Sequence, residues 1–390
     1  MEVLTSGRVK VFQTSVFSEL STYKKERVQR GLEVIDLSVG SPDLPPPPHV
    51  VDVLTESVKD FSQYGYSLKA TDEFNESVSF YYQNRFSVDV NARNEILQLV
   101  GSQDGLVHLP MVFADPGDIV LVPDPGYTAY EAGVLLASAT LYPMPLKKEN
   151  RFLPRLEDIP EEIAQKAKVM FLNFPGNPVP ALATKDFFEE VVRFAEKYQI
   201  VVVHDYAYSE LMFDGNRGIS FLEVEGAKEV GVEFNSLSKS FNMAGTRVGY
   251  IVGNAKIIEE INKVKSNLDY GIFLPIQKAA AAALKGDTGF LSQNALVYQK
   301  RRDTLVEGLA SIGWKVEKPP ATMFVWAELP KGWKSREFAL ELVHVGVVVT
   351  PGYAFGEHGE GYVRIALVQS EERLNRAVQL IDQSGILKKK

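Results

Sequence analysis

Short apolar runs alternate with helical segments from about residue 50 to residue 290, and this alternation is the feature that most constrains the fold. The runs are ILQLV, DIVLVPD, KVMFLNF, IVVVHD, GVEFNS and VGYIVG, which begin at residues 96, 118, 168, 200, 231 and 248. Helical segments such as KDFFEEVVRFAEKY, which begins at residue 185, lie between them. Such alternation is typical of a mostly parallel central sheet with helices on both faces. The predicted fold class is therefore α/β.

The rest of the chain predicts a second, smaller unit of α+β type. A long helical stretch, QNALVYQKRRDTLVEGLASI, is followed by the strand-like pieces FVWAEL, VGVVVT and YVRIAL. Near the N-terminus, four prolines at 45–48 follow VIDLSV and predict an extended connector. Because 390 residues exceed the usual size of one core, we expect a large domain at 50–290 and a small domain made of 1–49 and 291–390.

The composition excludes several kinds of chemistry and partner. The sequence has no cysteine, which removes thiol nucleophiles, disulfides and cysteine-based metal sites, and the expected location is the reducing cytoplasm. A net charge of -8 argues against nucleic acid or an anionic membrane as the main partner. The longest apolar run, AGVLLASATLY, is too short to span a bilayer. Nucleotide-binding and zinc motifs are also missing, so we expect no metal site.

Polar and aromatic residues directly follow the predicted strands. Ligands of open α/β sheets bind at the carboxyl ends of the strands, so these side chains should share one site. After the first strand, Gly101 permits a tight turn, and Ser102 and Gln103 begin a helix whose free N–H groups suit a phosphate. The other candidates in such positions are Tyr127, Asn177, Asp205, Tyr208, Ser236, Ser238 and Lys239, and Arg247 lies eight positions after Lys239.

One ligand would use all of these side chains: a phosphorylated aromatic ring that contains nitrogen and bears an aldehyde. The hydroxyls of Ser236 and Ser238 and the guanidinium of Arg247 would share the phosphate charge with the helix start at Ser102.

The remaining candidates match the ring of that ligand. Tyr127 would stack on the ring, and ionised Asp205 would keep the ring nitrogen protonated, so that the ring can accept electrons from a bound substrate. Asn177 and Tyr208 would donate or accept hydrogen bonds at its phenolic oxygen. That leaves Lys239 to form a Schiff base with the aldehyde.

Five segments, in chain order, resemble those of the class I/II aminotransferases that depend on pyridoxal phosphate and have fold type I. They are PDPGY at 123–127, GNP at 176–178, DYAY at 205–208, SLSKSFNMAGTRVG from 236 and GEGYVRIAL at 359–367. The similarity covers almost the whole chain. Within the family, HDYAYSELMFDG and FLEVEGAKEVGVEFNSLSKSFNMAG are most similar to the LL-diaminopimelate aminotransferase group.

This resemblance implies pyridoxal 5'-phosphate as cofactor, bound in the large domain, and a ping-pong transfer of an amino group from an amino acid to a 2-oxo acid. By the same resemblance Lys239 is the Schiff-base lysine and proton shuttle, and Arg364 binds the substrate α-carboxylate. Gly40 and Asn177 would also contact the substrate. A homodimer with a shared active site is implied, in which Tyr64 reaches the phosphate of the neighbouring subunit.

Some positions depart from the family pattern. The usual Asn-Pro-Thr-Gly turn is here Asn-Pro-Val-Pro at 177–180, which predicts another loop shape. Thr246 stands where close relatives have tryptophan, and Ala70 stands where glycine is common. Tyr66 is an alternative to Tyr64 for the contact between subunits.

Taken singly, each candidate has an ordinary explanation as a cap, turn or core residue; their joint occurrence favours a site. Two other functions stay open: a C–S β-lyase or another enzyme with the same cofactor, and a non-catalytic regulator that binds it. The donor also stays open among diaminopimelate, aspartate, alanine and aromatic amino acids, with 2-oxoglutarate the expected acceptor. Val16 and Phe17 are expected near the substrate side chain, and His204 either contacts Asp205 or packs in the sheet.

Overall fold

The computed structural model describes residues 3–10, 12 and 16–389, and it describes no side chain at residues 10 and 16–19. Val16 and Phe17, expected near the substrate, begin helix α2 (Val16–Gln29), and their side chains lie outside the described part. Among the described residues, no helix combines the length and the apolar character that crossing a bilayer requires.

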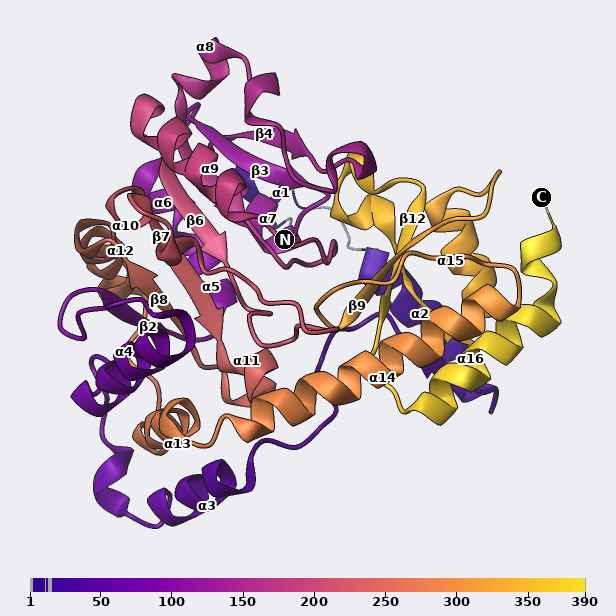
Figure 1. Cartoon of the computed structure of the whole chain (residues 1–390), viewed down its shortest axis with the longest axis horizontal. Helices are drawn as coiled ribbons and strands as arrows, with labels where there is room; N and C mark the ends of the chain where they lie inside the picture. The colour runs from indigo at the N-terminus through magenta and orange to yellow at the C-terminus, as the bar shows by residue number, and fades with distance from the viewer. Residues whose placement is uncertain (1–2, 11, 13–15, 390) are drawn as a thin grey trace.

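The main sheet has seven strands in the order β2-β8-β7-β6-β5-β3-β4 (Figure 1). Their bounds are β2 Ile96–Leu99, β3 Ile119–Asp124, β4 Thr140–Pro145, β5 Ala167–Leu172, β6 Val201–Asp205, β7 Gly231–Ser236 and β8 Gly249–Gly253. Only β8 runs antiparallel to its neighbours, β2 and β7. The predicted mostly parallel sheet is therefore confirmed, and each of the six predicted runs forms a strand. The edge strand β4 was missed because its sequence, TLYPMP, is half exposed and contains two prolines.

Helices cover both faces of this sheet. Alternate residues of one strand enter different cores: Ile119 and Leu121 pack on one face, and Val120 and Val122 on the other. The helices of the first half of the chain are α1 Gly7–Lys10, α3 Pro48–Ser57, α4 Asp72–Phe86, α5 Ser102–His108, α6 Pro110–Phe113, α7 Thr128–Leu136 and α8 Glu161–Ala164. Those of the second half, up to residue 285, are α9 Lys185–Tyr198, α10 Ala227–Val230, α11 Leu237–Ser240, α12 Ala255–Leu268 and α13 Leu274–Lys285.

The C-terminal part forms a second core. Its elements are α14 Gly289–Ser311, β9 Phe324–Glu328, α15 Ser335–His344, β10 Val347–Val348, β11 Thr350–Pro351, β12 Tyr362–Ala366 and α16 Glu371–Ser384. Strands β11, β12 and β9 make an antiparallel sheet, and β10 pairs in parallel with β1 (Ile35–Asp36). The N-terminal segment thus joins the C-terminal part. Figure 1 shows that α14 extends from the part that contains the main sheet to this second part.

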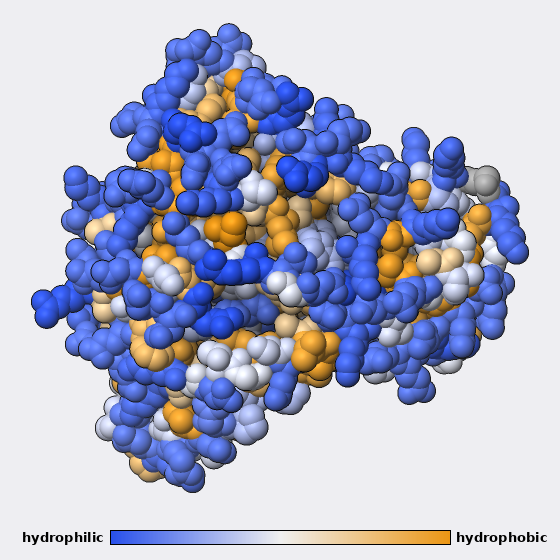
Figure 2. Space-filling view, in the orientation of Figure 1, coloured by the Kyte–Doolittle hydropathy of each residue, from blue (hydrophilic) through white to orange (hydrophobic). Residues whose placement is uncertain are grey.

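The domain bounds 50–290, 1–49 and 291–390 stay a prediction. Tyr208, Leu211 and Phe213, which precede residue 290, pack in the second core. The predicted connector is extended at 45–47, whereas Pro48 begins α3, a position that suits proline because the first helical N–H needs no partner. Figure 2 shows polar residues over most of one face, with apolar residues exposed in separate patches.

A buried polar cluster fixes the neighbouring strands β6 and β7. Fully buried Glu233 on β7 accepts hydrogen bonds from the Tyr82 hydroxyl (2.8 Å), the Ser220 hydroxyl (2.8 Å) and the backbone N–H of Phe221 (2.9 Å). The Nδ1 of His204 on β6 lies 2.8 Å from the same carboxylate. Because a buried carboxylate needs such partners, this cluster fixes the strands that end at the functional site.

Candidate active site

A cavity of about 520 Å³ lies where the carboxyl ends of β3, β5, β6 and β7 meet. Of the predicted catalytic, cofactor-binding and α-carboxylate-binding residues, Tyr64 alone does not line it, and the side chains of Val16 and Phe17 lie outside the described part. The cavity is lined by Gly40, Ser102, Gln103, Tyr127, Asn177, Asp205, Tyr208, Ser236, Ser238, Lys239, Arg247 and Arg364, together with Val39, Thr128, Asn173, Ala207, Ala244 and Phe324. Residues that are far apart in the sequence therefore share one concave surface, as a ligand site requires.

One end of the cavity suits a phosphate. The Arg247 guanidinium packs over Gly101, where the backbone has φ +79° and an added Cβ would lie 2.3 Å from the Arg247 Nη2 atom. Helix α5 begins at the next residue, Ser102, as predicted. Ser236 ends β7, and its hydroxyl accepts from the backbone N–H of Ser238 (3.2 Å). A cation, hydroxyls and free backbone N–H groups together form an anion site.

Asp205 ends β6 and is buried. Its carboxylate accepts a hydrogen bond from the Tyr130 hydroxyl (2.8 Å) and a longer one from the N–H of Ala207 (3.3 Å). Burial raises the pKa of Asp205, while these two hydrogen bonds oppose the rise. A buried carboxylate in this position favours a cationic partner such as a protonated ring nitrogen. The sequence prediction missed Tyr130, although its place on α7 three residues after Tyr127 was a usable signal.

Lys239 lies on α11, and its Nζ donates a hydrogen bond to the backbone oxygen of Gly40 (2.6 Å). Burial lowers the pKa of Lys239 to about 8, the charges of Arg364 and Arg247 act in the same direction, and Asp205 opposes them. The backbone at Gly40 can come this close because residue 40 has no side chain: an added Cβ would lie 2.3 Å from the Phe324 ring.

Arg364, on β12, is a buried cation that also lines the cavity. It donates to the Asn177 Oδ1 (2.6 Å), the backbone oxygen of Ser38 and the Thr350 hydroxyl (3.3 Å). No carboxylate pairs with Arg364 among the residues that the structure describes. Burial lowers the pKa of Arg364 to about 10. Because a buried charge without a counter-ion is costly, the arrangement favours an anionic ligand.

The loop after β5 brings Asn177 to Arg364. The Asn173 side chain donates to the backbone oxygen of Asp205 (2.6 Å) and accepts from the N–H of Asn177 (2.8 Å). The N–H of Gly176 donates to the backbone oxygen of Val179 (3.1 Å), which closes the loop at the departure from the family pattern. Asn173 was missed by the sequence prediction, although it too directly follows a strand.

Three other candidates have partners outside the expected ligand contacts. The Tyr127 hydroxyl donates to Gln103 (3.2 Å), and the Tyr208 ring packs edge-on against Phe324, with centroids 5.6 Å apart. His204 does not hydrogen-bond the Asp205 carboxylate: its Nδ1 lies against Glu233, and its Nε2 lies 3.1 Å from the backbone oxygen of Phe174.

Tyr64 lies outside the cavity of its own chain. Its side chain is 57% exposed, the hydroxyl donates to the backbone oxygen of Val58 (3.0 Å), and the ring packs against Phe273. Tyr66 is 87% exposed and packs against Tyr270. Both tyrosines are free to meet another molecule, and the choice between them stays a prediction.

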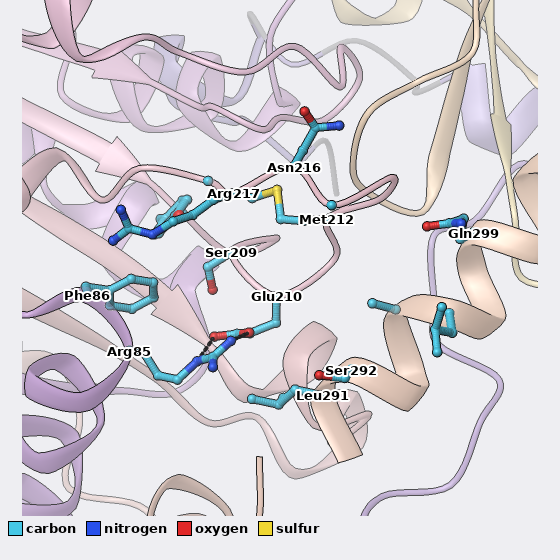
Figure 3. A pocket seen from close by; sticks show the side chains of 15 residues that line it. Arg85, Phe86, Ser209, Glu210, Met212, Asn216, Arg217, Leu291, Ser292 and Gln299 are labelled. Carbon is cyan, nitrogen blue, oxygen red and sulfur yellow. Dashed lines mark hydrogen bonds and ion pairs between the residues drawn. The ribbon is translucent and has the colours of Figure 1, made fainter. Parts of the chain in front are cut away.

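A second cavity, of about 460 Å³, is lined in part by Ser209 and Glu210 of the segment that follows Asp205 (Figure 3). Asp205 and Tyr208 face the first cavity, whereas Ser209 and Glu210 line the second. The buried Glu210 pairs with Arg85 (2.6 Å), as the dashed lines of Figure 3 indicate. The segment from Asp205 to Glu210 is thus held by the Tyr130 hydroxyl at Asp205 and by Arg85 at Glu210.

The residues of the first cavity fit pyridoxal phosphate. An anion site, a buried carboxylate, an aromatic side chain and an amine of lowered pKa correspond to the phosphate, ring nitrogen, ring face and aldehyde of that group. Arg364 is a further cation in the same cavity, which this correspondence does not use.

Comparison with known proteins agrees with this fit. Residues 33–381 match the family model of the class I and II aminotransferases. The LL-diaminopimelate aminotransferase of Moorella thermoacetica is 45% identical over 374 residues, covering 95% of this chain and 96% of the relative. That of Halothermothrix orenii is 44% identical and covers 98% of both chains. The solved structure of substrate-bound BacF from Bacillus subtilis is 39% identical, with a TM-score of 0.95 and 98% of both chains covered.

The family match spans most of the sequence, and the solved relative shares the arrangement of strands and helices. On these grounds the chain belongs to the class I and II aminotransferases, enzymes of fold type I that depend on pyridoxal phosphate.

Proposed function

We propose that this aminotransferase takes the amino group of its donor at the cavity that contains Lys239. The observation that carries the proposal is that a partly buried amine of lowered pKa and a buried guanidinium, with no carboxylate partner among the described residues, line the same cavity as Asp205. When bound, the cofactor supplies an acceptor for the electrons released as the Cα–H bond of the amino acid breaks.

The residues of the chain would divide the work as follows. Ser102, Gln103, Ser236, Ser238 and Arg247 bind the phosphate, Tyr127 covers the ring, Asp205 holds the proton of the ring nitrogen, and Asn177 and Tyr208 bind its phenolic oxygen. Lys239 is the covalent attachment point and, once released, moves a proton to and from Cα through Nζ. Arg364 orients the α-carboxylate, with Asn177 beside it and Gly40 presenting its backbone.

The pKa of Lys239 gives a prediction for the cofactor-free chain. Because burial lowers this pKa to about 8, the neutral, nucleophilic amine should form at lower pH than in an ordinary lysine, whose pKa is 10.5. The rate of acetylation of Lys239 in a short pulse of acetic anhydride, followed by peptide mass spectrometry, should rise through pH 8 and level off by about pH 9.5. Exposed Lys59 is the internal control. A rate that still rises tenfold between pH 9.5 and 10.5 would contradict the shift.

We propose LL-diaminopimelate as the donor and 2-oxoglutarate as the acceptor. The support is the name of the relatives, which are 44 to 45% identical over nearly the whole chain. A second candidate donor is an amino acid with an uncharged side chain. The charged side chains that line the cavity, Asp205, Lys239, Arg247 and Arg364, all have a proposed role, so within the described residues none is left for a distal charge. A charged donor would therefore need groups beyond these four side chains, from another subunit or from outside the described residues.

A panel of donors separates these candidates. With 2-oxoglutarate as acceptor, LL-diaminopimelate should give a kcat/KM at least about tenfold above aspartate, alanine and phenylalanine, a difference of about 1.4 kcal/mol in transition-state binding. The 2-oxo acid products are measured by mass spectrometry. A preference for phenylalanine or alanine would favour the second candidate, and steady release of pyruvate and ammonia without an acceptor would favour elimination.

We propose that the enzyme is a cytoplasmic homodimer with a shared active site. The absence of cysteine supports the location, because such a chain needs no oxidising compartment. Apolar side chains around Tyr64 support the dimer: Phe61, Tyr66 and Leu68 are 86%, 87% and 70% exposed. Exposed apolar residues gathered in one segment are typical of a surface that binds another chain.

Sedimentation tests the dimer. At micromolar concentration the enzyme should sediment at twice the chain mass of 43.4 kDa. Paired substitutions Tyr66→Asp and Leu68→Asp should shift it toward monomer, because they place charges in an apolar interface. Leu296→Asp, at a residue that is 53% exposed on α14, is the matched control and should stay dimeric. A wild-type chain that sediments only as monomer would remove the proposal.

A further inference from the structure

His358 and Asp124 join the two parts of the enzyme beside the active site. Asp124 is the last residue of β3, three residues before Tyr127. His358 lies in the short 3-10 helix η7 (Glu357–Gly359), six residues before Arg364. The Nδ1 of His358 is 2.8 Å from Oδ2 of Asp124, and the backbone N–H of His358 donates to Oδ1 (3.2 Å). Both oxygens of one carboxylate therefore bind the same distant residue.

The backbone around this pair is shaped to bring the two segments together. Gly356 has φ +133°, and an added Cβ would lie 1.9 Å from Oδ1 of Asp124, so the carboxylate packs against bare backbone. The N–H of Gly126 donates to the backbone oxygen of Phe355 (2.8 Å). The side chain of Asp124 is 11% exposed and that of His358 is 33% exposed, so the interaction is only partly open to water. A hydrogen bond in such a place is weakened less by solvent than one on the surface.

Both segments adjoin the catalytic cavity: one carries Tyr127, which lines it, and the other carries Phe355, which packs against the lining residue Arg364. Residue 355, next to Gly356, is a buried phenylalanine whose ring lies 4.8 Å from the Arg364 guanidinium. Tyr127 follows Gly126 directly and lines the cavity. His358 and Phe355 are absent from the cavity lining, and the contact of His358 with Asp124 joins the segment of Phe355 to that of Tyr127.

We propose that His358 is a positioning residue for the α-carboxylate site. By binding both oxygens of Asp124, it holds the 355–358 segment against the loop of Tyr127 and so keeps Phe355 against the guanidinium of Arg364. Because the proposal rests on the proposed role of Arg364, its main consequence is for the binding of carboxylate substrates.

The first test is a kinetic comparison in the cofactor-loaded enzyme. His358→Ala should raise the KM of the amino donor roughly tenfold and change kcat less than about threefold, since the substitution loosens a binding residue and leaves the reacting groups intact. His358→Asn should recover most of the loss, because its amide can donate to Asp124 from nearly the same position as Nδ1.

A matched control separates this role from general loosening between the two parts. Lys148→Ala removes an ion pair of 2.6 Å with Glu328 on β9, which also joins the two parts, but neither residue lines the catalytic cavity. This variant should keep the wild-type KM. An equal rise of KM in the Lys148 and His358 variants would overturn the specific role of His358.

A second measurement does not depend on activity. Hydrogen exchange of the cofactor-loaded enzyme should become at least about tenfold faster at residues 355–359 in His358→Ala and return toward wild type in His358→Asn. Glutarate, a dicarboxylate that cannot react, should bind the Ala variant roughly tenfold more weakly by calorimetry. Unchanged exchange and unchanged glutarate affinity would overturn the proposal.

The outcomes separate this proposal from the proposed function. If the wild-type enzyme transferred no amino group from any donor, the function would fail, while exchange and glutarate binding would still decide the role of His358. If the His358→Ala variant did not fold, His358→Asn and Asp124→Asn would decide the role of His358. His358→Asn should resemble wild type. Asp124→Asn should raise KM with little change in kcat. Equal loss of kcat and kcat/KM in both would contradict the proposal.

Discussion

The burial of Lys239 among charged groups is the physical constraint on which the site depends. Desolvation favours the neutral amine, and the nearby positive charges of Arg247 and Arg364 act in the same sense. The opposite shift at buried Asp205 leaves a carboxylate that needs a cationic partner. Both perturbations come from one source, the burial of these two groups at the carboxyl end of the sheet. Burying ionisable groups in this way costs free energy of folding. For that reason, groups with perturbed pKa values are found mainly at functional sites.

The fold creates this cavity through the order of its strands. Neighbouring parallel strands β3, β5, β6 and β7 end at one edge, so the residues that follow them converge. The network around Glu233 ties β6 to β7. Loop contacts then refine the positions: Asn173 connects the loop of Asn177 to the backbone of Asp205. Arg364 comes from the second core, so the relative placement of the two parts sets the distance between amine and guanidinium.

Much of this arrangement could be predicted from the sequence, and the exceptions have physical reasons. Buried parallel strands are continuous apolar runs, so their ends were visible and so were the polar residues behind them. Edge strand β4 lacks that signal because it is half exposed and interrupted by proline.

Among the site residues, Asn173 and Tyr130 were missed because they hydrogen-bond other protein groups. No atom of the expected ligand required them as partners. The alternatives for His204 could not be separated, because its partner Glu233 is 29 residues away and only the sheet register brings them together. Tyr64 lies outside the cavity of its own chain. Its expected contact is with the cavity of a neighbouring subunit, which the structure of a single chain does not contain.

The most direct test of the central claim is to find where the cofactor attaches. The cofactor-saturated enzyme is reduced with borohydride, digested and mapped by mass spectrometry. The account predicts a pyridoxyl phosphate mass on the peptide that contains Lys239, fixed on its Nζ, with the other lysines unmodified. Recovery of that peptide without the added mass, or attachment of the cofactor to another lysine, would contradict it.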